Sequence, residues 1–64
     1  MDNELVQLIE NMETQLHEAA GETMKFIGGN NSAGTRVRKA MQNIKNLAQH
    51  VRVEVQEQKN SVTA

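Results

Sequence analysis

Several residue types are missing from this chain or nearly so, and each absence narrows the possible folds. There is no cysteine, so neither a disulfide framework nor a thiolate metal site can stabilise it. Proline, tryptophan and tyrosine are also absent and Phe26 is the one aromatic residue, which is unusual for a β-sheet protein and suits long helices. No run approaches the roughly 20 apolar residues that cross a bilayer, so we expect no membrane contact.

The length of 64 residues allows one domain with a marginal hydrophobic core. A domain of this size buries only about 60% of the surface that its unfolded chain exposes. Because disulfides are excluded, association with another chain is the remaining source of stability. We therefore expect a partner, most simply a second copy of the same chain.

The net charge of −1 conceals a division between two halves. Residues 1–32 contain six acidic residues and one basic residue, a net of −5, whereas residues 33–64 contain six basic and two acidic residues, a net of +4. The two halves therefore attract each other. The acidic start of the chain is unlike the basic head of a signal peptide, and we expect a cytoplasmic protein.

Apolar residues recur in each half with the alternating spacing of four and three that marks one face of a helix. We predict helices over about residues 3–27 and 33–60, joined by a Gly-Gly-Asn-Asn-Ser turn at 28–32. Gly28 is suited to end the first helix, and Asn31 or Ser32 to cap the second. The predicted seam comprises Leu5, Ile9, Met12, Leu16, Ala19, Thr23 and Phe26 on the first helix and Val37, Met41, Ile44, Ala48, Val51, Val55 and Gln58 on the second.

So short a link makes the two helices antiparallel neighbours, and the predicted fold is an all-α, coiled-coil-like hairpin. Residues that face each other then have numbers that sum to about 60, as for Phe26 and Gly34. Leu8 and Leu47 lie beside the seam and widen the apolar stripe beyond what one helix covers, so we expect two hairpins to form a four-helix bundle. The predicted core and dimer contacts are Leu5, Leu8, Ile9, Met12, Leu16, Phe26, Met41, Ile44, Leu47, Val51 and Val55.

The sequence offers no constellation suited to catalysis. His17 and His50 point away from the predicted seam, and a two-helix hairpin provides no pocket of the size that ligands use. The spacing of Gly29 and Gly34 resembles that of a phosphate loop, but Thr35-Arg36 stands where lysine followed by serine or threonine is required. We expect no enzymatic activity, no cofactor, no metal and no small-molecule substrate.

Basic residues gather on the predicted second helix. Arg38, Lys45, Arg52 and Lys59, here called the basic row, recur every seven residues and so form one line beside the seam, spaced by roughly 10.5 Å. In one interpretation these charges pair with acidic residues of the first helix or of a second subunit, for example Lys45 with Glu13. In the other they meet an external anion.

Two further basic residues and a threonine lie near the predicted turn. Thr35, Arg36, Arg38 and Lys39, here called the turn cluster, lie at the start of the second helix, where main-chain N–H groups favour phosphate binding. The alternative is that these bases balance Glu18 and Glu22 across the hairpin. The sequence leaves both interpretations open.

The second half also carries a run that resembles a known family. Ser-Ala-Gly-Thr-Arg-Val-Arg-Lys-Ala at 32–40 is followed by Leu-Ala-Gln at 47–49 and Arg-Val-Glu-Val-Gln at 52–56. This pattern is similar to the core domain of the bacterial linker-histone-like proteins first associated with chlamydial chromatin, whose Lys-rich tail has no counterpart in it. The resemblance implies DNA compaction and, with Thr35 added from the turn cluster, gives as candidate nucleic-acid contacts Thr35, Arg36, Arg38, Lys39, Lys45 and Arg52.

Two hypotheses of different classes follow. The first is a non-enzymatic, histone-like, nucleoid-associated protein that acts as a homodimer and contacts DNA phosphates without reading sequence, because no base-reading motif is present. The second is a protein–protein interaction or structural assembly module that binds no nucleic acid. Salt-dependent binding to DNA separates the two.

Overall fold

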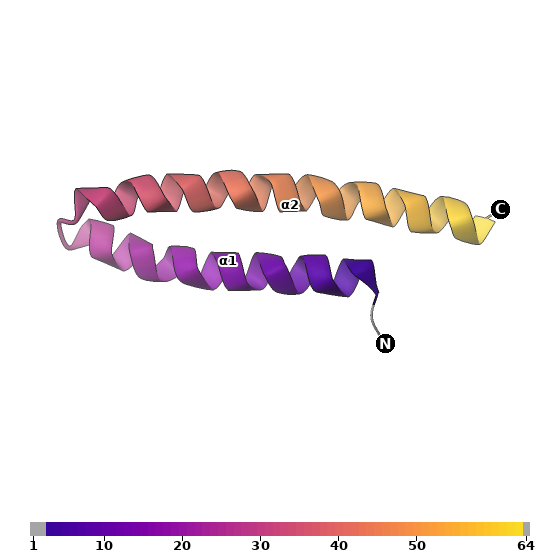
Figure 1. The fold of residues 1–64 in the computed structure, drawn as a ribbon, viewed down its shortest axis with the longest axis horizontal. Coiled ribbons are helices and arrows are strands. Elements are labelled where there is room, and N and C mark those ends of the chain that lie inside the picture. Colours follow the sequence, from indigo (N-terminus) through magenta and orange to yellow (C-terminus); the bar gives the residue numbers. More distant parts are fainter. Residues whose placement is uncertain (1–2, 64) are drawn as a thin grey trace.

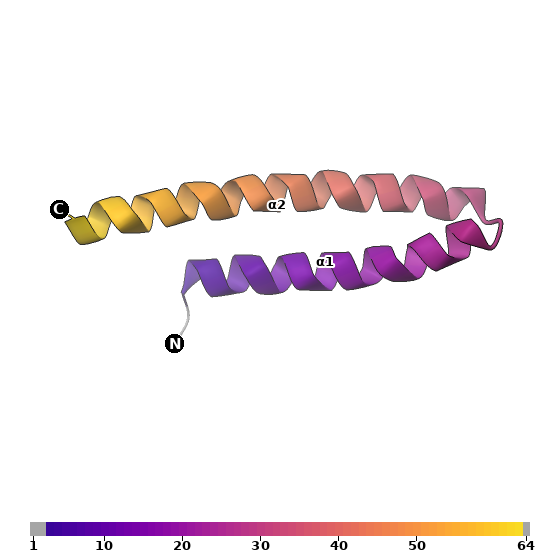
Figure 2. The same cartoon turned by 180° about the vertical axis from the view of Figure 1, so that it is seen from behind.

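The computed structural model describes residues 3–63, with side chains as far as Ser61, as two antiparallel helices joined by a short turn (Figure 1). Helix α1 spans Glu4–Ile27 and helix α2 spans Asn31–Thr63. Seen from behind, the helices still lie side by side, and α2 continues beyond the start of α1 (Figure 2). The molecule measures 53 × 21 × 10 Å and is therefore one helix thick. The predicted all-α hairpin is confirmed.

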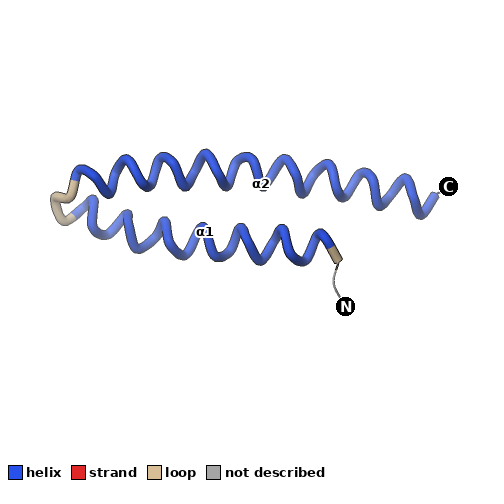
Figure 3. The backbone as a smooth tube through the Cα atoms, in the orientation of Figure 1, coloured by secondary structure: helices blue, strands red, loops and turns tan. Residues whose placement is uncertain are grey.

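The turn between the helices, drawn in tan in Figure 3, comprises residues 28–30 and is shorter than the predicted 28–32. Gly28 ends α1 by donating its N–H to the carbonyl of Met24, and Gly29 has a φ of +109°, a left-handed conformation that favours glycine. The Oδ1 of Asn30 accepts a hydrogen bond of 3.1 Å from the N–H of Ala33. Asn30 is therefore the N-cap of α2, and the prediction of Asn31 or Ser32 was wrong because the preceding residue already satisfies that N–H.

The other end of the hairpin is fixed by Asn3. Its Oδ1 accepts the N–H of Leu5 at 2.8 Å, which caps α1, and also accepts the side-chain amide of Gln58 at 2.9 Å. Together with the ion pair between Glu22 and Arg36, this contact sets the register. The numbers of these pairs sum to 61 and 58, in agreement with the predicted value of about 60.

The line of contact between the helices differs from the predicted seam in one of its two rows on α1. The row that includes Leu5 and Met12 does face α2, but the second row is Leu8 and Gln15, which are half-buried. Ile9 and Leu16 were predicted to occupy that row and are instead 44% and 57% exposed. The prediction for these two residues was wrong as far as contact within the hairpin is concerned.

Helix α2 shows the same rotation. Ala40 and Leu47 are half-buried against α1, whereas Met41 and Val55, which were assigned to the seam, are 42% and 38% exposed. On each helix, apolar residues lie on both sides of the row that was predicted correctly, which on α1 contains Leu5 and Met12. The spacing of apolar residues therefore did not show which of the two sides faces the other helix. Polar contacts between the helices, such as the pair of Glu22 with Arg36, favour the observed rotation because they bring the row containing Glu22 toward α2.

The hairpin has very little core of its own. Among residues 3–61, the buried apolar residues are Ala19 and Ala33, at 2% and 0% exposure, and no large side chain is fully buried. Both are small, which lets the helices approach closely at these points. The large apolar side chains of the hairpin thus remain in partial contact with solvent.

Candidate nucleic-acid interface

The hairpin presents two broad faces of different chemistry. On one side of the contact line, here called the polar face, a shallow cleft is lined by charged and amide side chains that include Glu18, Glu22, Lys39 and Asn43. The opposite side of the contact line, here called the apolar face, carries the exposed and partly exposed rows that the seam prediction had placed inside. Its members are Ile9 and Leu16 on α1 and Met41, Ala48 and Val55 on α2.

The turn cluster lies on the first two turns of α2, where Arg36 and Lys39 line the polar cleft together with residues of α1 and where Thr35 and Arg38 lie near Phe26. All four of its residues are exposed. Because successive residues are about 100° apart on a helix, Arg38 lies toward the apolar face, Arg36 toward the polar face, and Thr35 and Lys39 between them. The cluster therefore covers the outer surface of α2 beside the turn.

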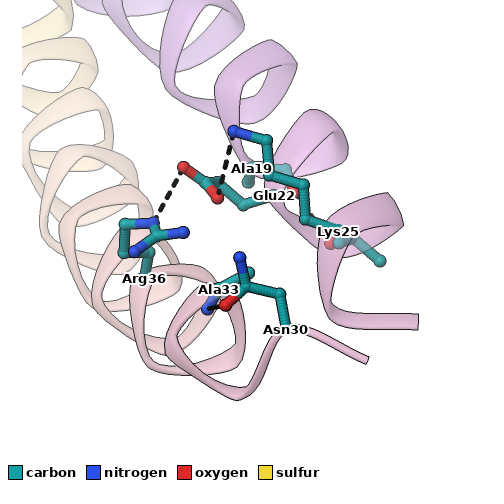
Figure 4. A network of polar contacts seen from close by, with 7 residues as sticks. Ala19, Glu22, Lys25, Asn30, Ala33 and Arg36 are labelled. Atoms are coloured by element: carbon teal, nitrogen blue, oxygen red, sulfur yellow. Dashed lines mark hydrogen bonds and ion pairs between the residues drawn. The ribbon is translucent and has the colours of Figure 1, made fainter. Parts of the chain in front are cut away.

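Arg36 is held by a carboxylate of the neighbouring helix (Figure 4). Its Nε donates to Oε2 of Glu22 at 2.9 Å, while Nζ of Lys25 lies 3.9 Å from Oε1 of the same carboxylate. The hydrogen bond from Arg36, with a smaller contribution from the positive charge of Lys25, holds the pKa of Glu22 below its ordinary value. The proposed balance between Glu22 and a base across the hairpin is therefore present for Arg36.

The rest of the turn cluster is not engaged in this way. Within the described part of the chain, neither Arg38 nor Lys39 forms an ion pair. The N–H of Ala33 is taken by the side chain of Asn30, so the start of α2 offers one donor fewer to a phosphate than an uncapped helix. The charges that remain open to an external anion here are those of Arg38 and Lys39.

The basic row borders the apolar face. Arg38, Lys45 and Arg52 each precede a residue of that face by three positions, which makes them its neighbours along α2. Lys45 and Arg52 line a shallow groove together with Ala48. Over residues 3–61 neither of them forms an ion pair with α1, so the pairing suggested between Lys45 and Glu13 is absent within one hairpin.

Other kinds of site find little support in the described residues. His17 and His50 are both exposed. Over residues 3–63, no three histidine, cysteine, aspartate or glutamate side chains gather in an arrangement that could hold a metal ion. Neither helix, over the same residues, has an apolar stretch of the length and hydropathy that a membrane span requires.

Comparison with known proteins decides the family. The model of the family described as histone H1-like protein Hc1 matches residues 6–61, which takes in most of both helices. The chain belongs to the histone H1-like Hc1 family. The resemblance deduced from the second helix is thereby confirmed. No curated protein and no solved structure gives a significant match.

Membership of the Hc1 family indicates a non-enzymatic, DNA-binding protein of the nucleoid. It also extends the resemblance to α1, which the sequence matched only in its apolar pattern. The sequence placed the basic row beside the apolar seam, but it did not show that the neighbouring flank of this seam is exposed in the Hc1-family chain, as it is at Met41 and Val55. That the basic row adjoins this flank follows from the three-residue offset between Lys45 and Ala48 and between Arg52 and Val55.

Proposed function

We propose that this protein binds DNA as a homodimer, through phosphate contacts and without sequence specificity. The observation that carries the proposal is the exposed pair Arg38 and Lys39 on the outer surface of α2, in a chain of a histone H1-like family. Basic side chains that meet phosphates provide affinity and position but no sequence information. Thr35 and Arg36 lie beside this pair, although Arg36 is also held by Glu22 and so contributes less to phosphate binding.

The separation of charge between the two helices explains how a chain of net charge −1 can bind a polyanion. The acidic residues are concentrated in α1 and the basic residues in α2, and packed helices lie about 8–10 Å apart. DNA that approaches the outer surface of α2 therefore meets the basic side chains first. The acidic helix lies behind α2, where its repulsion is weakened by distance and by salt.

The exposed apolar face supports the dimer. A hairpin in which no large side chain of residues 3–61 is fully buried needs further burial to be stable. An apolar surface that runs along both helices is typical of a contact with another protein. Two hairpins packed through this face form a four-helix bundle and double the number of phosphate contacts.

Two members of the basic row, Lys45 and Arg52, can meet either of two partners. Lys45 and Arg52 border the apolar face, so they are placed to contact a phosphate or a second subunit. The experiment on DNA is therefore directed at Arg38 and Lys39, which are close to the turn.

The proposal is tested by fluorescence anisotropy of a labelled DNA duplex, titrated at about 50 and 200 mM salt, where phosphate contacts show a steep salt dependence. The double substitution Arg38→Gln with Lys39→Gln should lower affinity at the lower salt by about tenfold or more. It should also reduce the slope of log affinity against log salt by about one for each phosphate that the variant no longer neutralises. It leaves the pair of Arg36 with Glu22 in place, so the hairpin keeps its link between helices.

The matched control is Lys25→Gln with Lys59→Gln, which removes the same charge from other parts of the surface. It should bind DNA nearly as well as the natural sequence. Equal losses of affinity in the two variants would mean that net charge and not the turn cluster governs binding. If the natural sequence binds no DNA even at low salt, the protein-interaction alternative replaces the proposal.

A further inference from the structure

We propose that the second subunit packs on the apolar face with its turn at the same end, so that Glu10 and Glu13 of each subunit meet Lys45 and Arg52 of the other. The inference rests on the proposed dimer and goes beyond it, because it fixes the direction of the partner and assigns part of the basic row to the interface. Charge complementarity between the two rims of the apolar face carries it.

The two rims of the apolar face have opposite charge. On α1, Glu10 and Glu13 line a shallow groove together with Leu5, Val6 and Ile9. On α2, the corresponding groove is lined by Lys45, Asn46, Ala48, Gln49 and Arg52. Each rim therefore combines apolar side chains that need covering with charges of a single sign.

Within residues 3–61, the charges on the two rims are not paired. Over the described side chains, none of Glu10, Glu13, Lys45 and Arg52 forms an ion pair. The acidic and basic rims lie on the outer flanks of the two helices, with the apolar face between them, so they do not reach each other within one subunit. A second subunit on that face brings charges from another chain to both rims.

Symmetry leaves two ways to stack two hairpins face to face. A two-fold axis parallel to the helices places α1 on the partner's α2, with both turns at the same end. A two-fold axis perpendicular to the helices places α1 on the partner's α1 and α2 on the partner's α2, with the turns at opposite ends. The second arrangement sets the two basic rims side by side and the two acidic rims side by side, whereas the first sets acid against base.

The register of the hairpin supports the first arrangement independently. A two-fold axis allows no shift along its own direction, so residues whose numbers sum to about 60 also lie level across the interface. Glu13 is then level with position 47 of the partner and Glu10 with position 50. Both heights fall between Lys45 and Arg52, and each carboxylate lies within about 3 Å, two helical residues, of the level of a basic residue.

This arrangement divides the candidate DNA contacts into two groups. Lys45 and Arg52 pair with the partner subunit's Glu10 and Glu13. Arg38 and Lys39 of both subunits lie at one end of the bundle, on helices that face each other across a diagonal of about 14 Å. DNA contact is thereby concentrated at the end that carries the turns.

The direction is measured by pulsed electron paramagnetic resonance on the full chain, which has no native cysteine. A nitroxide attached at Asn31→Cys, beside the turn, should give a distance below about 25 Å within the dimer if the turns share an end. Turns at opposite ends of two fully overlapping hairpins would lie about 36 Å apart, the length of the 24-residue α1. A distance of that size overturns the inference and leaves the dimer and DNA binding intact.

The matched label is Gln42→Cys, which lies near the middle of the hairpin and is exposed. Its two copies are at almost the same height in either arrangement, so it should give a measurable distance in both. Dipolar coupling absent from both labelled proteins would show that no dimer forms and would overturn the inference together with the proposed dimer.

The ion pairs are tested by reversing their charges. Glu10→Lys with Glu13→Lys should raise the dissociation constant of the dimer by about tenfold or more, since four pairs are replaced by four repulsions. Adding Lys45→Glu and Arg52→Glu to the same chain should restore it. If the fourfold variant has the helicity of the natural sequence by circular dichroism but does not recover dimerisation, the proposed pairing is wrong.

Discussion

Phe26 and Gly34 illustrate how a single small residue positions a large one. A Cβ at Gly34 would lie 2.7 Å from ring atoms Cδ1 and Cε1 of Phe26, so the ring crosses α2 where no side chain stands. The pairing of these two residues was predicted from the register, and the close approach confirms it. Gly34 is thus required by packing, although α2 is an ordinary helix at this point.

Gly21 occupies a different environment, and its replacement should stabilise the protein. It lies exposed in the interior of α1, and an added Cβ would meet no atom within 4 Å. Gly21→Ala should raise the free energy of unfolding by about 1 kcal/mol, because alanine loses less backbone entropy in a helix. Urea unfolding followed by circular dichroism, at one fixed protein concentration, measures the change.

Gly34→Ala is the matched comparison for that substitution. It carries the same gain in helix propensity, but its Cβ displaces the ring of Phe26. It should therefore be less stable than Gly21→Ala. Equal stabilisation by the two substitutions would contradict the role assigned to the contact between Gly34 and Phe26.

At the scale of the elements, a carboxylate of α1 stabilises the first turns of α2. Basic side chains near the N-terminus of a helix oppose the helix dipole, and α2 carries three of them in the turn cluster. Glu22 of α1 offsets part of this through its hydrogen bond to Arg36. The same contact brings one particular row of α1 toward α2 and so helps to set the rotation of both helices.

The contact between Glu22 and Arg36 should make stability depend on pH. Because folding lowers the pKa of Glu22, the pair contributes fully above the ordinary value of about 4.3 for a glutamate, and its contribution is lost as the pH falls through the lower folded value. Glu22→Gln should therefore lower the melting temperature at pH 7, and the difference from the natural sequence should shrink toward pH 3.

Glu18→Gln provides the control for this pH dependence. Glu18 lines the same polar cleft and forms no ion pair within the described residues. Its replacement should change the melting temperature less than Glu22→Gln at pH 7. If the difference in melting temperature between Glu22→Gln and the natural sequence stays constant from pH 7 to pH 3, the proposed contribution is ruled out.

At the scale of the whole molecule, the hairpin is a thin layer with an apolar surface on one side. Its smallest extent is 10 Å, and a layer one helix thick cannot enclose large side chains from both sides. A domain usually buries its apolar surface between two packed layers. The hairpin supplies one such layer, and the proposed partner supplies the other.

Two valines on α2 test this view of the molecule. Val55 belongs to the apolar face. Val53 is also exposed but lies on another side of α2, the same side as Lys39, which precedes it by 14 residues. Val55→Lys should raise the dissociation constant of the dimer by more than about tenfold, because an unpaired charge at a buried contact costs a few kcal/mol. Sedimentation equilibrium across micromolar concentrations measures it.

Val53→Lys makes the identical chemical change at a position that should remain in solvent. It should leave the dimer intact, and its melting temperature should still rise with protein concentration. If both variants dimerise equally well, the apolar face is not the interface. If both are monomers, the interface includes the opposite side of α2.

The candidate site was largely accessible to sequence reasoning, because its residues are close together in the chain. Thr35, Arg36, Arg38 and Lys39 share two turns of one helix, so any helix over this region places them on neighbouring surface. The pairing of Arg36 with Glu22 could only be weighed as an alternative. It depends on how two helices from distant parts of the chain are rotated against each other.

The sequence by itself determined the two helices, their antiparallel direction and their register. These features follow from local properties: apolar spacing, a glycine and asparagine turn, and a link too short for any other connection. Tertiary structure alone decided which side of the row containing Leu5 and Met12 faces inward, because both sides carry apolar residues; the contact between Glu22 and Arg36 favours the observed side. That selection leaves an apolar surface beside the basic row, formed by Ile9, Leu16, Met41, Ala48 and Val55.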